Sequence, residues 1–296
     1  MNRTDNHSSS KRKGISLILA LVALVALVGG FVLFNPFGKH TSSDKKDTSS
    51  SSSASSTAKK TTSTSSTKQV AKYEPSQEEK EYLANRFAQL TAVNPEAIAY
   101  VYAPGTQLDE PVVQTGDNAT YLDKTFEGGN QPLMGTVFMD TDNKKDFSDR
   151  LTWLFGHARG SQVEDHRMFN DVNFYDNQEY FNQHPYVVIE TPERKYYYEA
   201  MGLVIVPETT AFYRTSFTDD EDFTTQLKNI YESARTKNPN IKINASDKYL
   251  VLSTCREEDD TIRSNLYLRQ IPDSEMKDFL AKHGDQLNYV ATRGQE

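Results

Sequence analysis

The sequence predicts a mainly β fold with added helices, an α+β domain built around an eight-stranded β-barrel. Eight short runs are rich in β-branched and aromatic residues and are mostly bounded by Gly, Pro, Asn or Asp, which is the pattern of strands. Amphipathic helical patterns flank and interrupt them, and so many short strands are typical of a closed or nearly closed barrel. The predicted strands are residues 98–102, 112–114, 136–139, 151–155, 186–191, 195–206, 249–254 and 262–271.

The barrel is preceded by a predicted helix. Ser76 followed three residues later by Glu79 is typical of a capping box, in which each side chain satisfies a free backbone N–H of the first turn. Leu83, Phe87 and Leu90 recur at helical spacing. We therefore expect an N-terminal helix that ends near Leu90.

A second predicted helix, at 222–237, is inserted before the strand that carries the cysteine. The acidic residues 219–222 lie in or before its first turn, where negative charge complements the helix dipole. Its apolar residues share one face and are Phe223, Leu227, Ile230, Tyr231 and Ala234. A shorter helix is expected to start near Pro272.

The first quarter of the chain has a different composition. Residues 15–34 carry no charge, and a helix of this length spans roughly 30 Å, the thickness of the bilayer hydrocarbon. The preceding residues are basic, so the positive-inside rule places residues 1–14 in the cytoplasm. A cleaved signal peptide is the alternative, but its apolar region is usually about 7 to 15 residues long. We expect an uncleaved transmembrane signal anchor in the cell membrane, a Ser/Thr/Lys-rich flexible linker at 35–72, and an extracellular domain at 73–296.

Charge and cysteine content narrow the function. Residues 1–72 hold 11 Lys or Arg against 3 Asp or Glu, whereas the rest hold 22 against 38. Such an acidic domain is poorly suited to nucleic acid, which requires clustered Lys and Arg. The single cysteine, Cys255, has no partner for an internal disulfide. It is either a small buried residue or a nucleophile, and its count alone does not decide between them.

Three residues at predicted strand ends could carry chemistry. Cys255 follows the strand 249–254, His157 follows the strand 151–155 after Gly156, and Arg263 opens the strand after the cysteine loop. A neighbouring imidazolium raises the thiolate fraction of a cysteine and can protonate a leaving amine. A guanidinium can stabilise the negative charge that acyl transfer places on the carbonyl oxygen.

These residues resemble the signature of the sortase family. The segment Leu252-Ser253-Thr254-Cys255, the upstream Gly156-His157 and the downstream Arg263 are similar to its T-L-x-T-C motif, histidine and arginine, although Val251 stands where that motif has its first Thr. Further stretches resemble class B, as does the helix inserted before the cysteine strand. They include Asn94-Pro95-Glu96, Pro111-Val112-Val113-Gln114 and Gly135-Thr136-Val137-Phe138-Met139-Asp140.

The resemblance implies a cysteine transpeptidase. Such an enzyme cleaves a C-terminal sorting motif of a secreted protein, holds the acyl group as a thioester on Cys255 with His157 as acid/base and Arg263 at the oxyanion, and transfers it to an amine. An N-P-x-T-N-like motif is implied, with a cell-wall precursor or a pilin lysine as acceptor. We expect Ser253, Thr254 and Ile230 to contact the substrate, the helix 222–237 to form one wall of its groove, and no cofactor or metal to be needed.

Alternatives remain at this point. A non-catalytic, membrane-tethered extracellular binding domain with a buried Cys255 would have the same barrel, and a hydrolytic cysteine protease would differ only in whether an amine captures the thioester. No G-x-S-x-G elbow indicates a serine hydrolase, and no compact ligand spacing near Cys255 indicates zinc. The rivals of the proposed site residues are His166, His184, His283 and Arg269.

Overall fold

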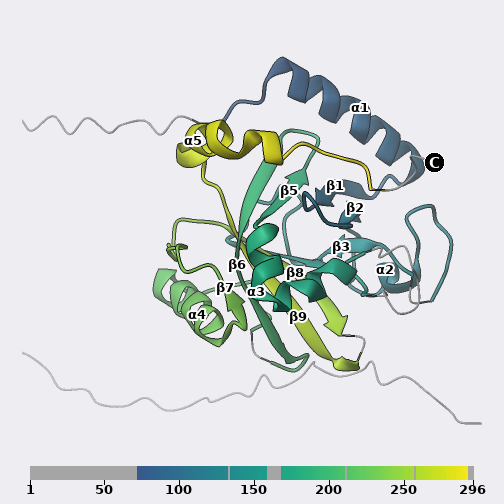
Figure 1. Cartoon of the computed structure of the whole chain (residues 1–296). Coiled ribbons are helices and arrows are strands. Elements are labelled where there is room, and N and C mark those ends of the chain that lie inside the picture. Colours follow the sequence, from purple (N-terminus) through teal and green to yellow (C-terminus); the bar gives the residue numbers. More distant parts are fainter. Residues whose placement is uncertain (1–71, 133, 159–167, 211, 257, 293–296) are drawn as a thin grey trace, which may run out of the picture. The chain divides into compact units, whose positions relative to one another are not determined.

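A computed structural model of the chain describes residues 72–292, apart from 133, 159–167, 211 and 257 (Figure 1). The predicted cytoplasmic segment 1–14, the anchor 15–34 and all but the last residue of the linker 35–72 lie outside the described residues. Within the described part, no helix combines the length and the apolar character needed to cross a membrane.

Eight strands close into a barrel, as predicted. Neighbouring strands pair in the order β5-β1-β2-β3-β4-β8-β9-β6, and β5 pairs with β6 to close the ring. The pairs β2–β3 and β4–β8 are parallel, and the others are antiparallel. The eight are β1 (Ala97–Tyr102), β2 (Asp109–Val113), β3 (Val137–Met139), β4 (Leu151–Phe155), β5 (Tyr186–Glu190), β6 (Lys195–Pro207), β8 (Tyr249–Arg256) and β9 (Asp259–Gln270).

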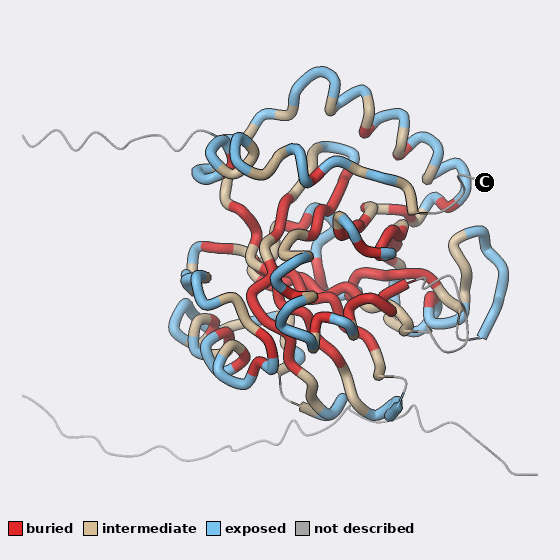
Figure 2. The backbone as a smooth tube through the Cα atoms, in the orientation of Figure 1, coloured by how far each residue is buried: buried red, intermediate tan, exposed pale blue. Residues whose placement is uncertain are grey.

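The helices lie outside the barrel. In Figure 1, α1 and α5 lie together at the top of the view, and α4 lies beside β6 and β7 at the lower left. Buried residues gather in the central strands, and the outward faces of the helices are exposed (Figure 2). The helices are α1 (Gln77–Val93), α2 (Thr120–Asp123), α3 (Gln178–Gln183), α4 (Asp220–Ser233) and α5 (Asp273–His283), with short 3-10 helices η1 (Asn170–Asp176) and η2 (Gly284–Gln286).

The predicted helix 222–237 is wrong at its C-terminal end. The helix α4 begins as the acidic pattern indicates, because the Asp219 side chain accepts a hydrogen bond from the backbone N–H of Asp222 at 2.8 Å. It ends at Ser233, because Ala234 is extended and the following strand β7 (Thr236–Lys237) pairs with β6. The backbone hydrogen bonds of these last residues therefore go to the sheet and not to a further helical turn.

Strand β8 is buried on both faces, and this positions its C-terminal end. Leu250 and Leu252 point into the barrel core, whereas Val251 belongs to the apolar cluster beneath α4. Because side chains alternate along a strand, Ser253 and Cys255 continue the outward row of Val251. This outward row runs from beneath α4 to the end of the barrel where β8 ends.

Candidate active site

Cys255 and Arg263 face each other across adjacent strands. Cys255 is the penultimate residue of β8, and its direct partner on the antiparallel strand β9 is Arg263. The short connection between the strands holds both residues at the same end of the sheet. Cys255 is partly exposed, which is the accessibility that a nucleophile needs and a packing cysteine does not.

His157 reaches the same end from β4. This strand runs parallel to β8 with Phe155 opposite Ser253, so the residue after Gly156 lies beside the cysteine. The Gly156 N–H donates to the Ser253 carbonyl at 3.2 Å, and the His157 carbonyl accepts from the Phe169 N–H at 2.9 Å. Both hydrogen bonds hold the backbone of the strand end in place.

Glycine is required immediately before the histidine. A Cβ at position 156 would lie 2.9 Å from the Phe169 ring and 3.1 Å from Val137. Both neighbours are packed in the apolar core of the barrel, so they have little room to move. The Gly-His pair of the sequence thus has a steric cause.

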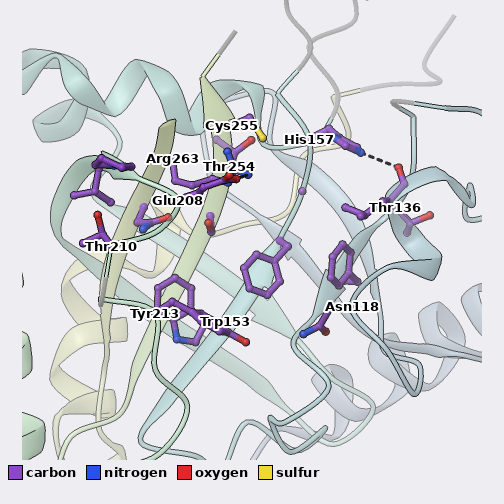
Figure 3. Close-up of a pocket in the computed structure, with 18 residues that line it drawn as sticks. Asn118, Thr136, Trp153, His157, Glu208, Thr210, Tyr213, Thr254, Cys255 and Arg263 are labelled. Atoms are coloured by element: carbon purple, nitrogen blue, oxygen red, sulfur yellow. Dashed lines mark hydrogen bonds and ion pairs between the residues drawn. The ribbon is translucent and has the colours of Figure 1, made fainter. Parts of the chain in front are cut away.

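The imidazole of His157 is turned away from the thiol. Its Nε2 lies 2.7 Å from the carbonyl oxygen of Leu122, and Figure 3 shows the ring directed toward that oxygen and away from the sulfur of Cys255. A carbonyl oxygen only accepts, so Nε2 carries a proton in this arrangement. The pair is adjacent but not aligned for proton transfer.

A cavity of about 350 Å³ opens over the three residues (Figure 3). Its floor is the outer face of β4, β8 and β9, where the aromatic rings of Trp153 and Phe155 stack with centroids 6.1 Å apart. One wall comes from the segment around α2, and the other from the connection between β6 and α4, including Tyr213. The size and the mixed apolar and polar lining are those of a ligand-binding cleft.

Arg263 is held in an ion pair in this state. Its Nη2 lies 2.6 Å from Glu208 Oε2, and its Nη1 donates to the Asp260 carbonyl at 2.5 Å. Glu208 lies just past the end of β6, and its N–H donates to the Thr261 carbonyl at 2.8 Å, so the carboxylate is fixed against β9. The sequence did not indicate Glu208, because its place depends on how β6 and β9 are paired.

The surroundings favour a protonated cysteine at rest. Burial raises the pKa of the Cys255 thiol, the Arg263 guanidinium lowers it, and the carboxylates of Asp260 and Glu208 raise it again. The net pKa lies above the ordinary thiol value. The resting group at neutral pH is therefore the thiol, and a base or a rearranged charge is needed to form the thiolate.

A 3-10 helix supports the nucleophile from behind. The Asn173 side chain in η1 donates to the carbonyl oxygen of Cys255 at 3.1 Å. Arg256, the next residue, forms an ion pair with Asp176 at the end of η1, at 3.2 Å. Neither η1 nor these contacts were predicted, because 3-10 helices have no strong sequence period.

The rivals of the proposed residues lie elsewhere. His184 packs on Tyr180 with ring centroids 4.4 Å apart, and His283 packs on the Tyr186 ring at 5.1 Å. His166 lies outside the described residues. Arg269 is at the other end of β9, where it pairs with Asp247 at 2.7 Å and with a carboxylate of α5.

Two of the three predicted substrate residues line the cavity. Ser253 and Thr254 do so, although both are largely buried. Ile230 does not, because it is fully buried in the apolar cluster between α4 and the barrel. Among the described residues that line the cavity, none belongs to α4; the wall predicted for this helix is formed by the connection that precedes it.

The closed barrel, with Cys255, His157 and Arg263 in one cavity, has the arrangement that the resemblance to the sortase family implied. The comparisons agree. The chain is 26% identical over 182 residues to sortase B of Listeria monocytogenes, covering 61% of this chain and 71% of that protein. A Staphylococcus aureus sortase B–substrate complex superposes with a TM-score of 0.58 at 25% identity, covering 64% of this chain and 86% of that one.

A sortase B structure complexed with triglycine gives the same TM-score of 0.58 at 25% identity, over 64% of this chain and 87% of that chain. No protein-family model matches the chain. Together the fold and these relatives support a sortase of class B.

Proposed function

We propose that this chain is a cysteine transpeptidase that cleaves a C-terminal sorting motif of secreted proteins and transfers the acyl group to an amine. The observation that carries the proposal is the direct pairing of Cys255, near the end of β8, with Arg263 of β9, with His157 beside them in one cavity. A thiol, a potential acid/base and a guanidinium are the groups that acyl transfer requires.

The reaction proceeds in two balanced steps. His157 accepts the thiol proton of Cys255, the sulfur attacks the peptide carbonyl, the C–N bond breaks, and His157 gives that proton to the departing amine. A thioester remains on the enzyme. An acceptor amine then attacks the same carbonyl, the C–S bond breaks as the new amide forms, and the amine proton returns to the histidine and thiolate pair. Arg263 stabilises the negative oxygen in both steps.

Two side chains have to move before this chemistry. The His157 ring leaves the Leu122 carbonyl and turns toward the sulfur, and Arg263 directs part of its guanidinium from Glu208 to the substrate oxygen. Catalytic hydrogen bonds often become aligned only in the substrate complex, so a peptide in the cavity is the expected trigger.

The partners follow from the relatives. A substrate complex and a triglycine complex of sortase B support a peptide donor and a primary amine acceptor for this chain. We propose an N-P-x-T-N-like donor motif, with a cell-wall precursor or a pilin lysine as the acceptor. The apolar segment 15–34 would hold the enzyme at the membrane, with the catalytic domain outside.

The test is cleavage of a labelled sorting-motif peptide with and without triglycine. We expect cleavage in both cases and a new amide-linked product only with the amine. Hydrolysis at the same rate without an amide product would indicate a cysteine protease. Absence of cleavage across a panel of motifs would favour the binding domain.

A further inference from the structure

Asn265 lies on the floor of the cavity that Cys255 and Arg263 also line. It follows Arg263 by two residues on β9, so both side chains lie on the same face of the strand. Its partner on β8 is Ser253, which in turn lies opposite Phe155. Asn265 is only 5% exposed, yet it lines the cavity.

In the described part of the chain, the side-chain amide of Asn265 lacks a hydrogen-bond partner for its oxygen. Its Oδ1 is buried and has no hydrogen-bond partner among the described residues. Buried polar atoms rarely lack a hydrogen-bond partner, because burial removes their hydrogen bonds to water and nothing then replaces them. An orphan polar atom that lines a substrate cavity is explained if the substrate supplies the missing partner.

Two other described residues near the site have an unpaired polar atom, and each differs from Asn265 in its position. The hydroxyl of Tyr267, on the same face of β9, is equally unpaired, but it is fully buried beneath α4 and lines no part of the cavity. Thr254 also lines the cavity, but its unpaired hydroxyl belongs to a residue that alternates to the other face of β8 from Ser253 and Cys255. Of these three residues, only Asn265 both lines the cavity and lies on the outer face of the sheet, where the catalytic residues are.

The chemistry of the floor selects the group that fits. The rings of Trp153 and Phe155 make it apolar, so a charged side chain would lose its hydration there. An aliphatic side chain would leave Oδ1 unpaired. A carboxamide satisfies both requirements, because it is neutral and pairs with another amide as both donor and acceptor.

We infer that Asn265 is a specificity-determining residue that reads a carboxamide side chain of the peptide donor. This rests on the proposed transpeptidase function. Two residues along a strand span about 7 Å, so the side chain read is that of a residue near the scissile bond and not the residue attacked.

The experiment uses the full-length protein and a peptide panel. Asn is exchanged for Leu, which has nearly the same shape, at one position of the motif at a time, and kcat/KM for amide formation with triglycine is measured. The wild type should prefer Asn over Leu at one position by about tenfold, the effect of one net hydrogen bond. In Asn265→Leu that preference should disappear, while preferences at other positions and the rate of thiol alkylation stay unchanged.

Tyr267→Phe is the matched control, because it removes an orphan hydroxyl from the same face of the same strand outside the cavity. It should keep the wild-type preference. If Asn265→Leu keeps the preference, or if the wild type has none, the inference is wrong while the proposed function stands. If the wild type transfers no peptide at all, the proposed function is wrong and the inference falls with it.

Discussion

At the scale of single residues, the pKa of Cys255 is raised by burial, lowered by Arg263, and raised by the carboxylates of Asp260 and Glu208, of which Glu208 also pairs with Arg263. The Glu208 carboxylate opposes ionisation of the thiol, and its ion pair holds the Arg263 guanidinium that favours ionisation. Glu208→Gln removes a negative charge near the thiol and releases the Arg263 guanidinium. Both changes favour the thiolate, so the pKa of Cys255 should fall. At neutral pH the thiolate fraction and the rate of alkylation by iodoacetamide should rise by about two- to threefold, the size of an interaction between partly exposed charges.

The pH profile gives the sign of this effect. The wild-type alkylation rate should increase with pH through a midpoint above the ordinary thiol pKa, because burial disfavours the thiolate. Glu208→Gln should move that midpoint down. Glu275→Gln, which removes the carboxylate paired with Arg269 instead, should leave it in place. A midpoint that rises in Glu208→Gln would contradict the assigned role.

Arg263 can be distinguished from Arg269 by conservative substitution. Lysine keeps the charge but loses the planar fork that binds an oxyanion and a carboxylate together. Arg263→Lys should lower transpeptidation about a hundredfold, and Arg263→Ala should lower it further. Arg269→Lys should retain turnover once folded. Near-normal turnover in Arg263→Lys together with an inactive, folded Arg269→Lys would mean that the oxyanion role belongs to the other arginine.

The strand patterns place Cys255, His157 and Arg263 each at the end of a predicted strand, and the resemblance to the sortase signature predicts that the three act together. Glu208 and Asn265 could not be found in this way. Their proximity to the thiol depends on which residue of β9 faces which residue of β6 and β8, and the strand pattern does not fix that register. Side-chain orientation, such as the His157 ring on the Leu122 carbonyl, is equally a tertiary property.

At the scale of elements, α4 is a packing element of the barrel, and Ile230 tests this. Its side chain is fully buried against the sheet. Ile230→Ala should lower the free energy of unfolding by about 2 to 5 kcal/mol through the cavity it leaves. KM for the peptide should not change, and chemical denaturation with steady-state kinetics would show both.

Lys228→Ala, an exposed position on the same helix, is the control and should change neither quantity. A large rise in KM for Ile230→Ala with little loss of stability would instead indicate that this residue contacts the substrate.

The regular spacing of apolar residues made most helices and strands predictable from the sequence. All eight strands and the helices α1, α4 and α5 have clear patterns, and the structure confirms them. The predicted C-terminal end of α4 was wrong because Thr236 and Lys237 pair with β6, and this tertiary contact overrides the helical pattern of the sequence. The short elements α2, α3, η1 and β7 contain too few residues to show a period.

At the scale of the whole molecule, the described barrel would be tethered to a membrane. The linker 35–72 should have a root-mean-square span of roughly 30 to 35 Å, so the cavity would stay close to the bilayer. Full-length protein should remain with membranes after alkaline carbonate extraction. A variant that begins at residue 35 should be soluble and should keep the kcat/KM of the full chain. Release of the full-length protein by carbonate would contradict the anchor.

The most direct test of the transpeptidase is the mass of the intact protein after mixing with a sorting-motif peptide. The wild type should gain the mass of the N-terminal peptide fragment, held as a thioester on Cys255, and triglycine should remove it by forming an amide. Cys255→Ala should gain no mass while keeping the circular dichroism of the wild type. An adduct on Cys255→Ala, or a wild-type enzyme that forms amide product from a peptide without any adduct under rapid quench, would contradict a thioester mechanism at this cysteine.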